Sequence, residues 1–373
     1  MLITGIGLHP FGRFEDRTAT DMGVVAVRAA LAEAGVARGG FQAAFCGTAY
    51  GGVAAGHRVL GRLGMTGMPI VDVEAGCASG SAALMLAAAA VRAGQYDTVL
   101  VFGIEKMPKG IIRSSFFEPW QEEAGLTATP AYFALRAQRL MQTSGVTKSH
   151  LAQVVVKNRR HGVGNPNAMF RKDVSAADVL GSRVICEPLH LWMLCTPNEG
   201  AAAVVLQRDG AGTGPRLAAA VLRSHLPGGV LNESTPMAGL TDDTIPSATS
   251  LAALAAFEEA GVGPDDLNVV ECQDTDAARE LLSYEELGLC PPGGAAALLE
   301  SGAVDMGGTM PVNPSGGLLS KGEPLGASAL AQVVELVQQL RGTAGERQVD
   351  AAATALAHTV GRGANAGVVI LTR

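Results

Sequence analysis

The turn at residues 74–81 offers the clearest chemistry in the sequence. It reads EAGCASGS and follows the apolar run MPIVDV. We expect it to join a strand at residues 70–73 to a helix over residues 79–93, which would place Cys77 at the N-terminus of that helix. The positive end of a helix dipole and its unpaired N–H groups favour a thiolate and stabilise a developing oxyanion. The pattern predicts a nucleophilic cysteine, although most free cysteines only fill core space.

A second polar turn, at residues 313–327, reads NPSGGLLSKGEPLGA. Like the first, it lies between a strand-like segment and a long amphipathic helix, and this similarity suggests two related halves. Glu323 is a candidate base if its site is partly buried, but it is also well placed for an ion pair with Lys321. Asn313 and Ser315 are candidates for positioning substrate or water, or for stabilising the turn itself.

Of the 373 residues, 48% are hydrophobic, which predicts a globular protein with a large buried core. The length corresponds to about two domain-sized units. A net charge of -7 gives no electrostatic reason to expect nucleic acid or an anionic membrane as a partner. The N-terminal residues lack a secretory signal and no apolar run spans a bilayer, so we expect a cytoplasmic protein without membrane insertion. The six cysteines include no C-x-x-C pair, so zinc-ribbon spacing is absent and no metal site is expected. A reducing compartment also disfavours structural disulfides.

Alternating strand-like and helix-like segments predict an α/β fold. The expected strands lie at residues 2–6, 70–73, 98–102, 201–206, 216–223 and 267–271. The expected helices cover residues 21–34, 79–93 and 247–260. Residues from 110 to about 166 interrupt the alternation, and we interpret them as a loop-domain excursion on the substrate side. We therefore expect an N-terminal half at residues 1–210 and a C-terminal half at residues 211–373.

The second turn resembles the signature of the thiolase superfamily. In the family this element reads Gly-His-Pro-x-Gly, and the sterol-carrier-type branch carries nearly the same Asn-x-Ser-Gly-Gly-Leu-x-Ser-Lys run before it; here Glu323 replaces the histidine. Further ordered matches to this branch are PFGRF, LGMTGMPI, GIEKM, SYEELGLCPPG and LRGTAGERQV. The resemblance implies a five-layered αβαβα fold of two pseudo-equivalent halves. It also implies a homodimer or dimer of dimers that uses an acyl-CoA thioester as substrate and holds no permanently bound cofactor.

The residue roles that the family implies are only partly preserved. Cys77 is the implied acyl acceptor, and its own N–H with Gly363 or a neighbour would form the oxyanion hole. His358 lies near the family's Gln-His-Asn element and is, with Glu323, a candidate acid or base, although it also fits an ordinary interior histidine. Where the sterol-carrier-type branch has His-Asp-Cys-Phe, this chain has QDTD beginning at Gln273, so an imidazole and a second thiol are lost.

Three weaker features complete the set of candidates. His57 is a candidate pocket residue near a partner subunit, although an isolated histidine more often lies on a solvated helix face. Cys195 lies in CTPNEGA, which matches a family segment that shapes the core, so we expect it to pack without chemistry. The basic cluster of Arg159, Arg160 and His161 either contacts CoA phosphates or forms an ordinary surface.

These observations predict a non-standard thiolase that forms an acyl-Cys77 thioester and makes or cleaves a carbon–carbon bond by Claisen-type chemistry. One alternative is a C-acyltransferase that delivers the acyl group to a phenolic carbon and needs no α-proton abstraction. A second is a retro-aldol lyase, against which the retained cysteine argues. A third is a weakly catalytic scaffold subunit that pairs with a small zinc-ribbon/OB-fold protein.

Overall fold

The computed structural model describes residues 1–110, 119–123, 129–227, 244–361 and 365–373. The strands are β1 (Leu2–Gly12), β2 (Ala43–Gly47), β3 (Ile70–Val73), β4 (Thr98–Lys106), β5 (Val184–Cys186), β6 (Leu189–His190), β7 (Glu199–Gln207), β8 (Arg216–Ser224), β9 (Val269–Cys272), β10 (Thr354–Gly361) and β11 (Asn365–Thr372). The α-helices are α1 (Ala19–Glu33), α2 (Ala55–Leu63), α3 (Ser79–Arg92), α4 (Pro119–Glu123), α5 (Thr129–Ser144), α6 (Lys148–Gly162), α7 (Ala176–Gly181), α8 (Ala248–Ala260), α9 (Ala277–Glu286), α10 (Ala295–Glu300), α11 (Gly317–Lys321) and α12 (Leu325–Arg341).

The described strands form a nine-stranded mixed sheet and a separate hairpin of β5 and β6. The order in the large sheet is β3-β2-β4-β7-β1-β8-β11-β10-β9. Its two parts meet at one place, where β1 and β8 share a single register pair between Leu2 and Arg216. The strands β1 to β4 and β7 therefore form one half-sheet, and β8 to β11 form the other.

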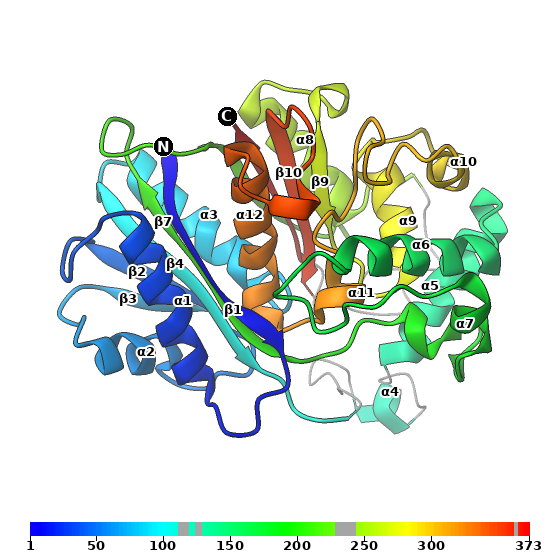
Figure 1. Cartoon of the computed structure of the whole chain (residues 1–373), viewed down its shortest axis with the longest axis horizontal. Coiled ribbons are helices and arrows are strands. Elements are labelled where there is room, and N and C mark those ends of the chain that lie inside the picture. The colour runs from blue at the N-terminus through cyan, green and yellow to red at the C-terminus, as the bar shows by residue number, and fades with distance from the viewer. Residues whose placement is uncertain (111–118, 124–128, 228–243, 362–364) are drawn as a thin grey trace.

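Helices cover both outer faces of the half-sheets and fill the space between them (Figure 1). The central layer consists of α3 and α12, which contact β4 on one side, while α3 also contacts β8 and α12 contacts β10. On the outside, α1 packs on β1 and β7, and α8 packs on β8 and β11. This succession of helix, sheet, helix, sheet and helix confirms the five-layered αβαβα arrangement that the resemblance implied.

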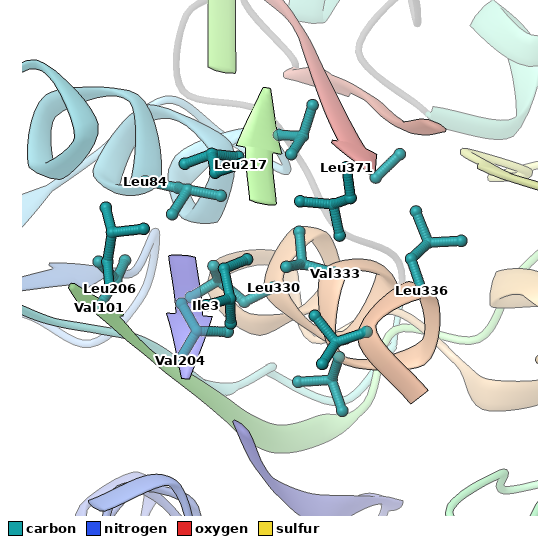
Figure 2. Packing of buried hydrophobic residues seen from close by; sticks show 14 of the residues in the cluster. Ile3, Leu84, Val101, Val204, Leu206, Leu217, Leu330, Val333, Leu336 and Leu371 are labelled. Atoms are coloured by element: carbon teal, nitrogen blue, oxygen red, sulfur yellow. The ribbon is translucent and has the colours of Figure 1, made fainter. Parts of the chain in front are cut away.

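The central layer is held by apolar side chains from both half-sheets. Figure 2 shows Ile3 and Val204 from the first half-sheet, Leu371 from the second, and Leu84 and Leu330 from the helices between them. All five side chains are buried. Burying an aliphatic side chain of this size stabilises the fold by about 1.5–3 kcal/mol, so this contact region fixes how the two halves meet.

The six predicted strands and three predicted helices are present with shifted bounds, so that β1 and β4 are longer than predicted and β9 begins two residues later. The strand expected before Asn313 is wrong, since the described structure has only an isolated β-bridge at Val312 there. The strands β2, β5, β6, β10 and β11 were not predicted. The predicted loop excursion at residues 110–166 is different: its described part is mostly helical, in α5 and α6. Because α6 packs on α9 and α11 of the second half, several of its polar residues are buried, and this obscures the helical periodicity in the sequence. The division of the chain near residue 210 stays a prediction.

Among the helices that the structure describes, each is too short or too polar to cross a lipid bilayer.

Candidate active site

Cys77 lies in a tight turn two residues before α3. Gly76 adopts a positive φ of 59°, and the Ser79 hydroxyl accepts a hydrogen bond from the Ala75 N–H at 2.9 Å and donates to the Gly76 carbonyl at 2.6 Å. The end of β10 packs closely on this turn, since a Cβ at Gly361 would lie only 2.1 Å from the Ala75 carbonyl oxygen. The thiol is therefore held by a rigid turn and the N-terminus of a 14-residue helix.

A cavity of about 1130 Å³ opens in front of Cys77, which is itself only 7% exposed. Its apolar wall includes Phe133 of α5, Phe170, Trp192 and Leu325. Basic side chains, Arg159 among them, also line the cavity, which is large enough for a sizeable acyl group. The structure thus joins an apolar pocket to the thiol that the sequence singled out.

Glu323 also lines this cavity, between α11 and α12. Its carboxylate accepts a hydrogen bond from Gln273 Nε2 at 2.8 Å and from Cys195 Sγ at 3.2 Å. Gly322 is required beside it, because its φ is 84° and a Cβ there would lie 2.0 Å from the Asn198 amide nitrogen. Lys321 does not hold Glu323, since its Nζ lies 3.3 Å from Glu271.

Cys195 is the unexpected member of the site. Burial raises the pKa of its thiol well above the usual value, and the neighbouring Glu323 and, more weakly, Cys77 raise it further. The thiol is therefore protonated at neutral pH and donates its proton to the Glu323 carboxylate. Gln273 joins the same cluster, because its side-chain oxygen accepts the Val360 N–H while its amide holds Glu323.

His358 lies elsewhere. It is fully buried on β10, its Nε2 is 3.0 Å from the Thr249 hydroxyl of α8, and it does not line the described cavity. Burial, and secondarily the charge of Arg279, hold the pKa of this imidazole well below its usual value. The structure therefore keeps His358 neutral and does not bring it together with Cys77 and Glu323.

Asn313 and Ser315 are buried in a polar network and do not line the cavity either. The Asn313 amide donates to Glu280 at 2.7 Å. The Ser315 hydroxyl and N–H donate to the Glu271 carboxylate at 2.7 and 2.9 Å. Both side chains thus stabilise the turn that precedes α11, which was the structural alternative considered for them.

Asp274 caps the N-terminus of α11 with hydrogen bonds. Its carboxylate accepts the N–H groups of Leu318 and Leu319 at 2.6 and 3.1 Å and the Asn158 amide at 2.8 Å. Burial, and then the charge of Glu280, raise the pKa of Asp274 well above its usual value. This network positions the segment that carries Glu323 without reaching the cavity.

The remaining candidates are dispersed. His57 is exposed on α2 and does not line the described cavity, and Gly363 lies outside the described residues. The basic cluster on α6 is divided: Arg159 lines the cavity, Arg160 is exposed near Asp305, and His161 is buried. In the described ranges, no group of three or more His, Cys, Asp and Glu side chains could hold a metal ion.

Comparison with known protein families connects this geometry to a family. Residues 2–184 match the model for the thiolase N-terminal domain, and residues 230–373 match the thiolase C-terminal domain-like model. The chain belongs to the thiolase family. It is 35% identical to Sterol carrier protein 2 of Bos taurus, over all of this chain and 71% of that protein, which confirms the resemblance to the sterol-carrier-type branch.

Two other relatives match along nearly their whole length. Benzoylsuccinyl-CoA thiolase subunit BbsB of Thauera aromatica is 36% identical over 98% of this chain and 95% of its own. The Acetyl-CoA acetyltransferase of Methanothermobacter thermautotrophicus is 34% identical over 100% of this chain and 99% of its own. The chain is accordingly a thiolase-family acyltransferase.

Solved structures agree on the fold of this thiolase-family chain. An Ltp2-ChsH2(DUF35) aldolase superposes with a TM-score of 0.87 at 24% identity, covering 100% of this chain and 97% of that one. Human mitochondrial 3-ketoacyl-CoA thiolase in complex with CoA superposes with a TM-score of 0.74 at 15% identity, covering 100% and 97%.

Within this thiolase-family site, Cys195 is the residue that sequence reasoning missed. Its segment was recognised as a family match, but a partly apolar stretch before β7 gives no local sign that its thiol faces another segment's carboxylate. The one sequence signal for a role of Cys195 was its place in the segment CTP, directly before an apolar strand. The contact with Glu323 depends on Glu323 N–H donating to the Thr196 carbonyl at 2.9 Å, which aligns two segments far apart in the chain.

Proposed function

We propose that this acyltransferase transfers the acyl group of a CoA thioester to Cys77 and then makes or cleaves a carbon–carbon bond by Claisen-type chemistry. The observation that carries the proposal is that Cys77, Cys195 and Glu323 all line one large apolar cavity. Within it, Cys195 Sγ donates a hydrogen bond to Glu323 Oε2 at 3.2 Å. A nucleophile and two proton-handling groups are the minimum that this chemistry requires.

In the first half-reaction, the Cys77 thiolate attacks the thioester carbonyl carbon. A new carbon–sulfur bond forms, the bond to the CoA sulfur breaks, and the departing CoA thiolate takes up the proton of the Cys195 thiol. The N-terminus of α3 favours the charged nucleophile. We retain the N–H groups of Cys77 and Gly363 as the proposed oxyanion donors, which would stabilise the tetrahedral intermediate.

In the second half-reaction, we assign Glu323 as the base that removes the α-proton of the incoming acyl group. The resulting carbanion attacks the acyl-Cys77 carbonyl carbon, and the Cys77 sulfur leaves as a thiolate. Cys195 is the second proton-handling group: it takes the α-proton from Glu323, to which it is hydrogen-bonded, and so regains the proton that it gave to CoA. We assign this second role to Cys195 in place of His358, and Gln273 is the residue that positions Glu323.

Intact-mass spectrometry tests the nucleophile. After incubation with acetyl-CoA and longer acyl-CoA thioesters, the wild-type chain should gain one acyl group and Cys77→Ala should gain none. Cys290→Ala is a matched control, because this thiol is partly exposed but does not line the cavity. Absence of an adduct with every thioester would contradict the proposal and favour the scaffold reading.

A C-acyltransferase is the second candidate, and one observation favours it. The residues of the described part that line the cavity include no imidazole, whereas a phenolic acceptor carries its own nucleophilic carbon and needs less base catalysis. The two reactions separate by what discharges the acyl-enzyme. Free CoA should remove the acyl group in thiolysis, whereas a C-acyltransferase should require the phenolic acceptor.

We also propose a homodimer or dimer of dimers and a small zinc-ribbon/OB-fold partner. One relative is named a subunit, and one solved neighbour is named as a complex of Ltp2 with ChsH2(DUF35). Val53, which is 90% exposed just before α2, suits contact with a second copy, and His57 would reach a cavity only across such an interface. Light scattering during size-exclusion chromatography tests the oligomer, and a monomer at micromolar concentration would contradict it.

The six cysteines form no disulfides, which supports the reducing, cytoplasmic compartment that we propose.

A further inference from the structure

Arg159 differs from the other buried cations of the cavity. Its guanidinium lies on α6, faces the cavity and stacks on Phe170, with Cζ 4.1 Å from the ring centroid. The residue is only 8% exposed. Within the described ranges the guanidinium forms no hydrogen bond and no ion pair, and its Nε is completely enclosed without a partner. Arg136 and Arg279 line the same cavity but pair with Asp276 and Glu286.

An unpaired buried guanidinium is energetically unfavourable. Removing a charge from water costs several kcal/mol unless an opposite charge or several hydrogen bonds replace the lost solvation. Stacking on Phe170 returns about 0.5–2 kcal/mol of this. Burial lowers the pKa of Arg159 to about 10, with no carboxylate opposing the shift, so the group still carries its charge at neutral pH.

The fold keeps this charge in place. α6 lies beside α11, the short helix that leads to Glu323 (Figure 1). Next to Arg159 the helix is fixed by two buried contacts of Asn158: its amide donates to Glu280 at 2.6 Å, and its carbonyl accepts the Ser320 hydroxyl at 2.9 Å. The backbone at Arg159 is therefore held in place beside the cavity.

We propose that Arg159 binds an oxyanion group of the substrate inside the cavity, where the planar guanidinium can hold two oxygens at once. The oxyanion is either a carboxylate at the far end of the acyl group or a phosphate of CoA. The geometry favours the acyl carboxylate, because Arg171, Lys172 and Arg183 are exposed cavity-lining cations that offer solvated charge to phosphates. The inference rests on the proposed function, since the anion belongs to the thioester that acylates Cys77.

Binding measurements with Cys77→Ala protein test this without any need for turnover. Calorimetry would compare glutaryl-CoA with pentanoyl-CoA, which have equal chain lengths but differ in the terminal carboxylate. It would also compare the corresponding N-acetylcysteamine thioesters, which lack the phosphates. Each ligand is measured with Arg159 intact and with Arg159→Met. Arg160→Met is the matched control, because Arg160 is the next residue on α6, is 57% exposed and does not line this cavity.

We expect Arg159→Met to weaken both glutaryl thioesters by roughly 10- to 100-fold, the usual effect of losing a hydrogen-bonded charge partner, and to leave both pentanoyl thioesters unchanged. Equal weakening of both CoA thioesters, with neither N-acetylcysteamine thioester affected, would assign the oxyanion to the CoA phosphate. The control should bind all four ligands as before.

Unchanged affinity for all four ligands overturns the proposal, and so does equal weakening of all four, which would indicate a structural role. If Arg159→Met does not fold, Arg159→Lys gives the same test: it should weaken the oxyanion-bearing ligands severalfold because it loses the two-pronged geometry. Failure of the proposed function is distinguishable, because it appears as a missing acyl adduct in wild-type protein, whereas these affinities do not depend on acylation.

Discussion

Replacing Glu323 with glutamine separates the two half-reactions. The change removes the carboxylate that we assign to α-proton abstraction and leaves Cys77, its turn and α3 untouched. The amide oxygen of the new side chain can still accept the bond from Gln273, but its NH₂ group would face the Cys195 thiol, which now donates to the carboxylate. We therefore expect a chain that folds normally and still accepts an acyl group, but that no longer ionises the second substrate.

The expected magnitudes follow from these contacts. One hydrogen bond to a charged acceptor is lost, so the free energy of unfolding should fall by about 1.5–3 kcal/mol at most. A positioned general base contributes about 10²- to 10⁴-fold to a rate, which corresponds to roughly 3–5 kcal/mol of activation free energy. Acylation of Cys77 should change far less than the α-carbon step, because the carboxylate takes part in the latter.

Deuterium uptake measures the α-carbon step alone. Wild-type protein incubated with an acyl-CoA in D₂O should exchange the α-hydrogens, and Glu323→Gln should slow this exchange by about 10²-fold or more. Intact-mass kinetics on the same samples report Cys77 acylation. Glu258→Gln, an exposed carboxylate on α8, is the matched control. The reasoning is refuted if the variant exchanges α-hydrogens at the wild-type rate, or if both steps slow equally. Absence of exchange in wild-type protein would favour the C-acyltransferase.

Two further predictions concern the stability of the fold. The pKa of His161 is lowered to about 3, first by burial, and its Nε2 accepts the Met306 N–H at 3.2 Å, so only the neutral ring fits. The folded pKa lies below the unfolded value near 6.5, so the free energy of unfolding should fall by about 1.4 kcal/mol per pH unit as pH drops from 6.5 toward 3. Urea titrations at several pH values should show a shallower loss for His161→Gln, and an identical dependence on pH in the variant would contradict this account. Leu330→Ala should cost about 2–5 kcal/mol, because Leu330 is fully buried between the half-sheets; a loss below about 1 kcal/mol in the same titration would contradict the packing described.

The sequence predicted the place of Cys77 in the fold and most of the elements that position it. Residues 74–81 belong to a local unit, in which a strand, a glycine-rich turn and a helix follow one another, and residues 313–327 are a glycine-rich turn that leads into α11 and α12. Such units form from short-range preferences. Cys77 could therefore be placed at a helix N-terminus without knowledge of the tertiary structure. The same reasoning placed Glu323 at a turn, where the structure also has it.

Only the tertiary structure decided which polar groups share the cavity. Cys195, Gln273 and Glu323 come from three segments far apart in the chain, and His358 and Asn313 were equally plausible from sequence. A side chain on a buried strand can face either adjoining layer, and the packing of α8 against the second half-sheet directs His358 toward Thr249. Local patterns thus determined where the Cys77 sulfur lies, whereas long-range packing determined its neighbours, because the direction and burial of a side chain depend on which layers meet.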